Sequence, residues 1–514
     1  MRKFDVLIVG CGPVGATLAN LLRMKGFQVA IFDRDKQIFE APRAMQIDAE
    51  SCRTFQQLGI QERLEGDDGR PAIHHVFVNE KRKILMALDF SDIAGNNGHP
   101  AAGLRFHQPA LERLLREDFE KTDKGPKVES FLGYEVLEVD GEGDAATLKA
   151  KNIDTGEIEE FSGAYMVGAD GGGSMCRKYI TQHRIDMNYS RQWIVMDVLV
   201  HDDALWNSLK DQSEFMCRPD GAVVFVKGCN NHVRFDFEVT AEEAARFSKD
   251  DALALIANYF DTSSITFQRM TPYHFYAGMP DKWRKGRVLI AGDAAHLTSP
   301  FSGQGLNMGL RDAANLAFKF DFVLRGLASE GFLDSYQDER WPECERTIRG
   351  ATARGLMISA SDFIGRLKRN LSFFIGRINP GLAVAMTAKM SDMSVYSQGL
   401  VGAHKLSGDR FIQPSVTPTG GAPSLLDDVA GDGFLLLLNE TAPAPSDSWF
   451  EDALDGKTFR LGAEIHDEDG ALAAYFEKHD ISAIMVRPDR YIFDCADDGA
   501  ALTDGLKSAL SAYQ

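Results

Sequence analysis

A glycine-rich turn near the start of the chain has the residue types and spacing that bind a nucleotide. It follows the apolar run 6–9, precedes a helical pattern at 16–24, and consists of Gly10, Cys11, Gly12, Pro13, Val14 and Gly15. Glycines at this spacing let the backbone approach a pyrophosphate closely, and the N-terminus of the helix directs N–H groups at it. Asp33 stands about 20 residues further on, where a carboxylate accepts hydrogen bonds from ribose hydroxyls. This pattern predicts a dinucleotide site and fits FAD and NAD equally well.

A second turn distinguishes the two cofactors. It follows the apolar run 288–291 and contains Gly292, Asp293, Ala294, Ala295 and His296, then Pro300, Gly303, Gln304, Gly305, Leu306 and Asn307. A carboxylate at the end of a strand can bind ribityl hydroxyls, and a helix that begins at such a turn stabilises negative charge with its N-terminal dipole. Reduced flavin gains negative charge around N1 and O2, so the turn predicts a flavin site.

Several cations could take part in a reaction, but the pattern favours structural roles for most of them. A histidine beside a flavin could transfer protons, yet we expect His296 to pack or hydrogen-bond as part of its turn. Four basic residues of the central region could hold an acidic substrate tail through charge-assisted hydrogen bonds: Arg218, Lys227, His232 and Arg234. We expect most of these side chains to face solvent and assign the tail to none of them.

The composition is that of a globular protein that binds small molecules. The chain has 514 residues, 44% of them hydrophobic, and its net charge of −19 disfavours nucleic acid and acidic membrane surfaces as partners. The seven cysteines are scattered, without a C-x-x-C pair or the spacing of a zinc site, so we expect free thiols in the cytoplasm and no metal. The first apolar run is too short to span a membrane and lacks the cleavage pattern of a signal peptide.

The elements expected around the motifs are those of an α/β protein with an inserted sheet. Residues 4–34 have the pattern strand, glycine turn, helix, strand, and alternation within residues 73–95 and 185–275 indicates a mostly antiparallel sheet. Apolar residues at spacings of three and four predict a long helix from Gly305, with more helix to about residue 395. The stretch 413–423 is rich in Pro, Gly and Thr and is typical of a linker, so we place a domain boundary there.

The second turn continues into a helix in a way that resembles the class A flavoprotein monooxygenases. In that family G-D-A-A-H is followed by a proline, by G-x-G-x-N and by a helix that begins G-x-R-D-A-x-N-L-x-x-K, which residues 309–319 match. A third family motif, which serves FAD and the pyridine nucleotide, is present as Gly168-Ala169-Asp170-Gly171 followed by Ser174 and Arg177, with Cys176 in place of the usual aliphatic residue. Further matches are Pro42-Arg43-Ala44, Gln108-Pro109 with Glu112, and Tyr336-Gln337 with Glu339-Arg340.

Within this family the chain is similar to the 3-(3-hydroxyphenyl)propionate hydroxylase group, at residues 42–48, 192–195 and 486–491. The resemblance implies that Arg43 and Gln108 contact FAD, that Asp33 binds the adenosine ribose and that Asp293 binds the ribityl–diphosphate region. The complete set of predicted cofactor-binding residues is Gly10, Gly12, Pro13, Val14, Gly15, Asp33, Arg34, Arg43, Gln108, Asp170, Gly292, Asp293, Pro300, Gly303, Gly305, Leu306 and Asn307. The loop of Pro300, Gly303, Gln304 and Gly305 would lie beside the isoalloxazine. No side chain is assigned as catalytic, because the flavin performs the chemistry.

The resemblance also implies the domain organisation. The FAD-binding domain, Rossmann-like and discontinuous, would comprise residues 1–72, 96–184 and 276–345, and the β-sheet substrate domain residues 73–95 and 185–275. A helical interface region would follow at 346–412. The larger members of the family end in a thioredoxin-like domain without redox cysteines, here residues 424–514. The lone Cys495 cannot form a dithiol pair, so that domain would serve in packing or dimer contact.

The activity that the resemblance implies is hydroxylation of a phenol. NADPH or NADH would reduce FAD, O2 would add to form a flavin C4a-hydroperoxide, and its distal oxygen would attack the aromatic ring. The donor would dock transiently because the sequence has no second glycine fingerprint, and the choice between NADPH and NADH stays open, as does a homodimer. Two alternatives remain: a Baeyer–Villiger or ring-opening oxygenase on the same scaffold, and a non-enzymatic binding protein like the GDP-dissociation inhibitors, which lack intact flavin motifs.

Overall fold

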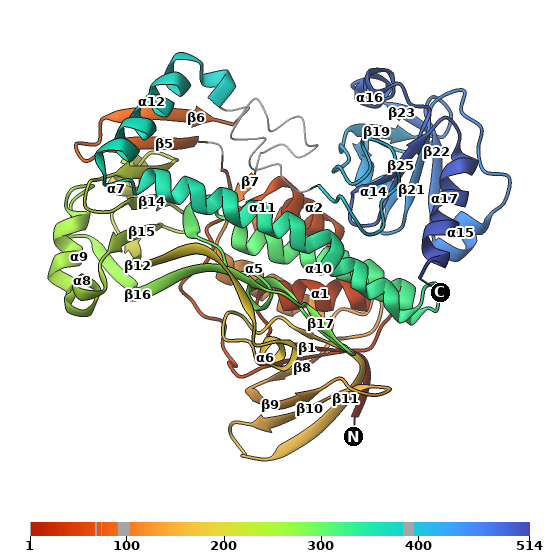
Figure 1. The fold of residues 1–514 in the computed structure, drawn as a ribbon, viewed down its shortest axis with the longest axis horizontal. Helices are drawn as coiled ribbons and strands as arrows, with labels where there is room; N and C mark the ends of the chain where they lie inside the picture. The colour runs from red at the N-terminus through yellow and green to blue at the C-terminus, as the bar shows by residue number, and fades with distance from the viewer. Residues whose placement is uncertain (1, 67–68, 73, 91–102, 384–394, 514) are drawn as a thin grey trace.

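The computed structural model describes residues 2–66, 69–72, 74–90, 103–383 and 395–513. Two parts are built on large sheets and joined by a long helix, and a smaller C-terminal domain packs beside them (Figure 1). Residues 73 and 91–102, which fall at predicted domain boundaries, lie outside the described residues. In the described part of the chain no helix is both long and apolar enough to cross a membrane.

The first sheet places the predicted glycine motifs at one edge. Its strands β18, β11, β1, β2 and β8 run parallel, and the register pairs Val9 with Phe32 and Gly168, and Gly168 with Ile290. The residues that follow these strand ends therefore meet at the carboxyl edge of the sheet, where open α/β sheets bind ligands. The strands in order are β17 (Arg284–Lys285), β18 (Val288–Ile290), β11 (Ile158–Gly168), β1 (Arg2–Val9), β2 (Val29–Asp33) and β8 (Glu129–Leu132), with β10 (Ala146–Asn152) paired to β11 and β9 (Tyr134–Asp140) paired to β10.

Two helices begin in the predicted turns. α1 (Pro13–Met24) starts in the first turn and α10 (Gln304–Leu324) in the second, and the two helices pack against each other. Their close approach requires Gly309, where a Cβ would lie 2.5 Å from Val14 Cγ2. The other elements of this part are β3 (Gln46–Asp48), α2 (Ala49–Gln57), α3 (Gln61–Glu65), β4 (Arg70–Pro71), β7 (Gly103–Arg105), α5 (Gln108–Glu117) and α6 (Met175–Ile180).

The second sheet is mostly antiparallel, as the alternation predicts. Among its described strands only β13 and β5 pair in parallel. The order is β16 (Ile265–Pro280), β12 (Arg184–Val200), β15 (His232–Val239), β14 (Val223–Lys227), β13 (Ser213–Cys217), β5 (His74–Asn79) and β6 (Ile84–Asp89). The helices beside it are α7 (Asp203–Ser208), α8 (Ala241–Arg246) and α9 (Lys249–Ile256). Two distant chain segments thus build one sheet, which is inserted into the nucleotide-binding part.

The long helix α11 (Asp334–Ile358) runs from the nucleotide-binding part to the second sheet, and α12 (Phe363–Ile378) then packs over β6 (Figure 1). The long helix that the spacing predicts from Gly305 is α10. The further helix predicted to about residue 395 is present as α11 and α12. Residues 384–394 lie outside the described residues, and 395–413 contain no helix.

The C-terminal domain has the strand order of a thioredoxin-like fold. Its sheet consists of β22 (Lys457–Arg460), β21 (Leu435–Leu438), β24 (Ala483–Val486) and β25 (Ile492–Ala496), in which β21 and β22 are parallel and the other pairs antiparallel. Its helices are α14 (Leu426–Ala430), α15 (Trp449–Leu454), α16 (Ala471–His479) and α17 (Gly499–Ser511).

The stretch predicted as a linker differs from the expectation. β19 (Ser415–Pro418) pairs with β20 (Ser424–Leu425) and β23 (Ile465–Asp467), because Val416 buries its side chain together with Ile465 in the core of this domain. The proline and threonine content therefore does not mark a free linker here. The exact domain boundaries stay predictions.

Candidate flavin site

The three glycines of the first turn have different roles. Gly10 has a φ of +103°, and a Cβ there would lie 2.3 Å from the carbonyl oxygen of Ala169; a Cβ on Gly15 would lie 2.0 Å from the carbonyl oxygen of Gly10. Backbone packing excludes a side chain at both positions. Gly12 has an ordinary φ of −75°, and a Cβ there would meet no described atom within 4 Å. Gly12 therefore leaves open the space into which a pyrophosphate would fit.

The two helices that begin in the turns have N-termini suited to anions. In the described structure neither α1 nor α10 has a side-chain cap, and neither has an acidic residue in its first turn. α10 follows Gly303, whose φ of +60° is left-handed. The unpaired N–H groups and the positive ends of both helix dipoles fit a diphosphate at α1 and the negative charge of a reduced flavin at α10.

Asp33 and Asp170 organise the backbone at the same edge. Asp33 accepts hydrogen bonds from the N–H groups of Cys11 at 2.8 Å and Asp35 at 2.9 Å. Oδ2 of Asp170 accepts the N–H of Met175 at 2.7 Å, while its Oδ1 is buried without a partner among the described residues. Burial raises the pKa of Asp170. A buried acceptor of this kind needs a donor from a ligand or water, which fits a cofactor hydroxyl.

Arg34 and Cys176 also lie near this edge, one exposed and the other buried. Arg34 is exposed, with its Nε 3.8 Å from Oδ1 of Asp35. Cys176, which departs from the family pattern, packs so closely that a Cβ on Gly168 would lie 2.3 Å from the Cys176 Cβ. This close approach requires glycine at position 168.

The carboxyl group of Asp293 is exposed to solvent and is also partly desolvated by the surrounding protein. Its side chain is exposed, yet enough protein surrounds it for desolvation to raise the pKa of the carboxyl group, against the opposing influence of His296 and Arg43. A group that is accessible and desolvated at once is typical of a cleft that binds a ligand. Asp293 is therefore well placed to contact a ribityl chain.

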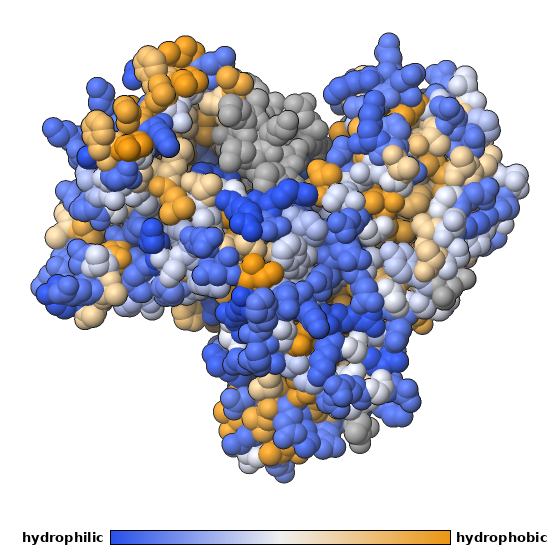
Figure 2. All heavy atoms as spheres, in the orientation of Figure 1, coloured by the Kyte–Doolittle hydropathy of each residue, from blue (hydrophilic) through white to orange (hydrophobic). Residues whose placement is uncertain are grey.

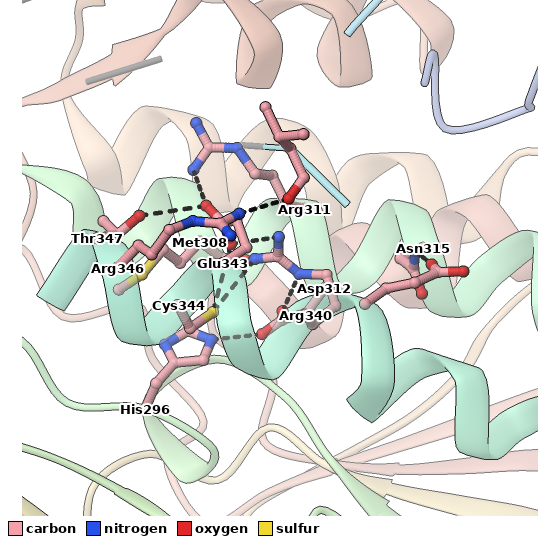
Figure 3. Close-up of polar contacts among 12 residues, drawn as sticks. His296, Met308, Arg311, Asp312, Asn315, Arg340, Glu343, Cys344, Arg346 and Thr347 are labelled. Carbon is pink, nitrogen blue, oxygen red and sulfur yellow. Dashed lines mark hydrogen bonds and ion pairs between the residues drawn. The ribbon is translucent and has the colours of Figure 1, made fainter. Parts of the chain in front are cut away.

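His296 belongs to a buried ion-pair network that holds this turn (Figure 3). Its Nε2 lies 2.6 Å from Oδ2 of Asp312, which also accepts the N–H of Gly292 at 2.9 Å. Nε of Arg340 donates to Oδ1 of Asp312 at 2.9 Å. Burial alone would lower the pKa of His296, but Cys344 and Asp312 raise it well above the ordinary value. The geometry supports the structural role expected for His296.

The same network includes three side chains of the kinds that bind metals, His296, Asp312 and Cys344, whose ligand atoms lie within 4.8 Å of one another. Arg340 donates hydrogen bonds both to Asp312 and, at 3.5 Å, to the sulfur of Cys344. A guanidinium therefore already supplies the positive charge between them, and we assign no metal here.

Gln108 and Asn307 act on neighbouring backbone. Oε1 of Gln108 accepts the N–H groups of Arg43 at 3.0 Å and Ala44 at 2.7 Å, which shapes the loop before β3. Oδ1 of Asn307 accepts the N–H of Asp48 at 3.0 Å, and its amide donates to the carbonyl of Gly303 at 2.9 Å. Both amides hold the loops that border the cleft, and their direct contact with FAD stays a prediction.

The expectation that most of the basic residues of the central sheet face solvent is wrong. Lys227, His232 and Arg234 are buried, and each has a partner in the protein. Nζ of Lys227 donates to the carbonyl of Leu209 at 2.9 Å, Nε2 of His232 lies 3.0 Å from Asp197, and Nε of Arg234 donates to Asp236 at 2.9 Å. Arg218 pairs with Asp220. Strand residues in the middle of this sheet are covered on both faces, which a single sequence does not reveal.

Sequence reasoning missed the contact between the C-terminal domain and the nucleotide-binding part. Arg487 is fully buried and pairs with Glu339 of α11 at 2.8 Å and with Asp489 at 2.7 Å. The hydroxyl of Tyr491 donates to Glu50 of α2 at 2.5 Å, and Arg311 of α10 donates to the same carboxylate at 2.6 Å. In the sequence the stretch 486–491 stands out only for its family resemblance. The several charged residues within it were the signal that could have indicated this contact.

Comparisons with known proteins agree with this geometry. A family model described as the FAD binding domain matches residues 3–351, and one described as the HcaD C-terminal domain matches residues 408–509. The chain is 31% identical to a probable NADH-specific resorcinol 4-hydroxylase of Rhodococcus jostii, over 99% of this chain and 95% of that protein. It is 30% identical to a 3-(3-hydroxy-phenyl)propionate/3-hydroxycinnamic acid hydroxylase of Burkholderia cenocepacia, over 100% and 97%.

Solved structures show the same fold. The complex of aklavinone-11 hydroxylase with FAD and aklavinone superimposes with a TM-score of 0.82 at 21% identity, covering 99% of both chains. The flavin-dependent monooxygenase PieE, in complex with FAD and substrate, superimposes with a TM-score of 0.81 at 19% identity and the same coverage. With a matching FAD-binding model over most of its length and full-length relatives at about 30% identity, the chain belongs to the family of FAD-dependent aromatic hydroxylases, a class of flavoprotein monooxygenases.

Proposed function

We propose that this enzyme binds FAD at the carboxyl edge of the first sheet and hydroxylates a small phenol, with NAD(P)H as electron donor and O2 as oxygen source. The observation that carries the proposal is the convergence of three motifs, distant in sequence, at the ends of β1, β11 and β18. The space at Gly12, the uncapped N-termini of α1 and α10 and the unpartnered oxygen of Asp170 fit the cofactor.

Each part of FAD has a proposed partner in this chain. The turn at Gly12 and the N-terminus of α1 hold the diphosphate, Asp33 binds the adenosine ribose, and Asp293 binds the ribityl chain. The turn 300–305 and the N-terminus of α10 border the isoalloxazine and stabilise the negative charge of its reduced form. Bound FAD supplies the redox chemistry, by accepting hydride from the nicotinamide and activating O2 for transfer to the ring.

The protein's own part in the reaction is to position the ring and exclude water. Phe301, in the turn beside the isoalloxazine, packs against Trp193 of β12 with 5.3 Å between ring centroids. These aromatic side chains build an apolar wall, and keeping water away from an activated flavin prevents unproductive release of peroxide. The two relatives are named for resorcinol and for 3-(3-hydroxyphenyl)propionate. We therefore infer a phenol with a second substituent at the meta position, and NADH as the first donor to test.

Turnover with a panel of phenols tests this proposal. Purified protein should be yellow, and with NADH or NADPH in air it should convert a meta-substituted phenol to a product heavier by one oxygen atom. A ring-opened or lactone product would assign the enzyme to the alternative oxygenases instead. Protein that binds no flavin, or that adds oxygen to no member of the panel, would refute the proposal.

We further propose that the enzyme acts in the cytoplasm as a homodimer that forms through α12. Eight large apolar side chains lie exposed in and just after this helix, where Figure 2 shows a hydrophobic patch: Phe363, Ile364, Leu367, Leu371, Phe374, Ile375, Ile378 and Leu382. At roughly 100 Å² each they offer about 800 Å², which is one side of a standard interface and more than a monomer usually exposes.

The spacing within α12 favours a second copy of the helix as the partner. Positions 364, 367, 371, 374 and 378 alternate by three and four residues, which is the seam of two helices packed side by side. A two-fold axis near Leu371 would pack the helices antiparallel and bring Asp362 of each copy towards Arg377 of the other. Opposite charges would then flank the apolar seam at both ends.

A further inference from the structure

Arg354 of α11 is partly buried and lacks an anionic partner among the described residues. Its Nε atom is buried and has no hydrogen-bond partner, and no ion pair to its guanidinium occurs in the part of the chain that the structure describes. Burial lowers the pKa of Arg354, and no acidic group offsets this effect. A desolvated guanidinium without an anion is unfavourable, so such a residue is generally kept for a ligand.

Other buried or partly buried arginines near the same sheet have anionic or carbonyl partners, although Nε of Arg105 also lacks a hydrogen-bond partner. Arg105 donates to the carbonyl of Lys227 at 2.8 Å and lies 3.6 Å from Asp211. Arg269 donates to Asp197 at 2.6 Å, and Arg234 pairs with Asp236. The unpaired state of Arg354 is therefore not a general feature of this region.

Arg354 lies next to the turn that borders the proposed isoalloxazine site. Its neighbour Gly355 packs on Phe301 so closely that a Cβ on Gly355 would lie 2.4 Å from the phenyl ring. Phe301 in turn contacts Trp193 and Tyr189 of β12, at centroid distances of 5.3 and 6.3 Å. An anion at Arg354 would therefore sit near the place where the aromatic ring must meet the flavin.

A second group, on strand β5, lies close enough to Arg354 to be influenced by its charge. His75 of β5 has a pKa of about 3, lowered by burial and by the charges of Arg105 and Arg354, so its imidazole is neutral near pH 7. Its Nε2 is buried without a partner among the described residues, and its ring contacts Phe90 and Phe215 at 5.3 and 5.8 Å. Two cations, a polar imidazole and aromatic rings together suit an aromatic molecule that carries an acidic group.

We propose that Arg354 binds the carboxylate of a phenolic acid substrate, with His75 beside it, so that the phenol ring extends from this point towards the turn at Phe301. This inference rests on the proposed function and narrows it, because it selects phenols with an anionic tail over neutral diphenols such as resorcinol. Arg354 acts in specificity and takes no part in the oxygen transfer.

The test compares 3-(3-hydroxyphenyl)propionate with its neutral methyl ester, using the FAD-loaded enzyme without nicotinamide. Dissociation constants are measured from the change in flavin absorbance. The parent enzyme should bind the acid at least about tenfold more tightly than the ester, and Arg354→Gln should weaken binding of the acid about 10- to 100-fold while changing that of the ester less than about twofold. Arg354→Lys keeps the charge but loses the bidentate geometry, so its affinity for the acid should lie between those of the parent and of Arg354→Gln.

Arg349→Gln is the matched control, because Arg349 lies on the same helix, is exposed and pairs with Glu345 at 2.8 Å. It should bind both compounds like the parent. Flavin content and melting temperature establish that each variant is folded. If Arg354→Gln loses FAD, the inference is tested instead by the ratio of the dissociation constants of acid and ester measured with Arg354→Lys.

Equal binding of acid and ester by the parent, or an equal loss of both in Arg354→Gln, would overturn the inference. A variant that binds the acid normally but shows a raised KM for NADH would assign Arg354 to the dinucleotide phosphates and also overturn it. Resorcinol is tested beside the acid and the ester in a separate turnover assay with NADH or NADPH in air. Failure of the parent to hydroxylate any of the three compounds would count against the proposed function instead. Hydroxylation of resorcinol alone would leave that function intact and exclude an anionic substrate.

Discussion

Gly12 and Gly10 belong to the same turn, but substitution of Gly12 should affect cofactor binding, whereas substitution of Gly10 should affect folding. Replacement of Gly12 by valine should abolish FAD binding, because the side chain would enter space that no described atom occupies and that the diphosphate needs. We expect an apoprotein with a parent-like melting temperature and an FAD affinity reduced at least about 100-fold, measured by fluorescence titration. Gly10→Val is the control that should destabilise the fold itself, since its φ is +103° and a Cβ would collide with Ala169. Parent-like FAD affinity in Gly12→Val would remove this glycine from the site.

Asp312 should contribute stability that depends on pH. Burial alone would raise its pKa, but His296 and Arg340 lower it from 3.8 to about 2. A pKa that is lowered in the folded state favours the ionised form, so the stabilisation is complete above pH 3.8 and is lost as the pH falls towards 2. Asp312→Asn should therefore cost about 2 kcal/mol, or about 2 °C in the melting temperature of a chain of this length, between pH 5 and pH 8. The difference from the parent should shrink at pH 3, and a constant difference down to that pH would contradict the electrostatic explanation.

The turn between β18 and α10 is an element that can couple substrate binding to flavin reduction. One end is held by Asn307, which bonds to the carbonyl of Gly303, and the other by the contact of Phe301 with Gly355. A Cβ on Gly305 would lie no closer than 3.4 Å to its nearest neighbour, Thr298, so the turn is not tightly packed at this position.

A phenol that binds beside Phe301 should therefore shift the flavin towards the nicotinamide. We expect a substrate to raise the rate of anaerobic FAD reduction by NADH or NADPH at least about tenfold, equivalent to roughly 1.4 kcal/mol of barrier, and a non-phenolic analogue to raise it less. Stopped-flow absorbance with and without the ligand measures the effect. Reduction that is equally fast without an aromatic ligand would argue against any such coupling.

We expect the C-terminal domain to support the whole molecule through its interface and to have no redox role. Burial raises the pKa of Cys495 to about 12, so its thiol is not ionised at neutral pH, and Cys495→Ser should keep turnover within about twofold of the parent. Removal of residues 424–514 should instead yield insoluble protein. It would expose Phe318 and Phe322 of α10, which pack against Phe434, and leave Glu339 without Arg487. Soluble, FAD-loaded truncated protein, or an inactive but folded Cys495→Ser, would contradict this division of roles.

Association of two copies should depend on the apolar seam of α12. Leu371 is 57% exposed at its centre, and Leu371→Asp should convert a dimer into a monomer by placing two carboxylates opposite each other at the two-fold axis. Light scattering coupled to gel filtration gives the mass of each variant. Ile158→Asp, which changes an equally exposed residue on β11, should leave the mass unchanged. A parent that is monomeric at micromolar concentration would exclude this interface.

The motifs proposed to bind FAD could be recognised in the sequence because each is local. A glycine turn between a strand and a helix specifies its own backbone, and the parallel strands β1, β11 and β18 then bring such turns to a common edge. The alternating pattern of the second sheet and the spacing in α10 are likewise properties of short segments. Fold class and cofactor followed from these features, and the resemblance to a known family added the reaction type.

The partners of long charged side chains were decided only by the tertiary structure. Lys227, His232 and Arg234 look like solvated cations in the sequence, but the folded sheet buries each beside a partner. Arg354 lies among other arginines of α11 and has no local feature that sets it apart, yet it lacks an anion once β5 and α11 come together. The contact of Arg487 with Glu339 joins residues 148 positions apart. Burial and charge pairing depend on such distant contacts, and for that reason the substrate end of the site could be proposed only from the folded protein.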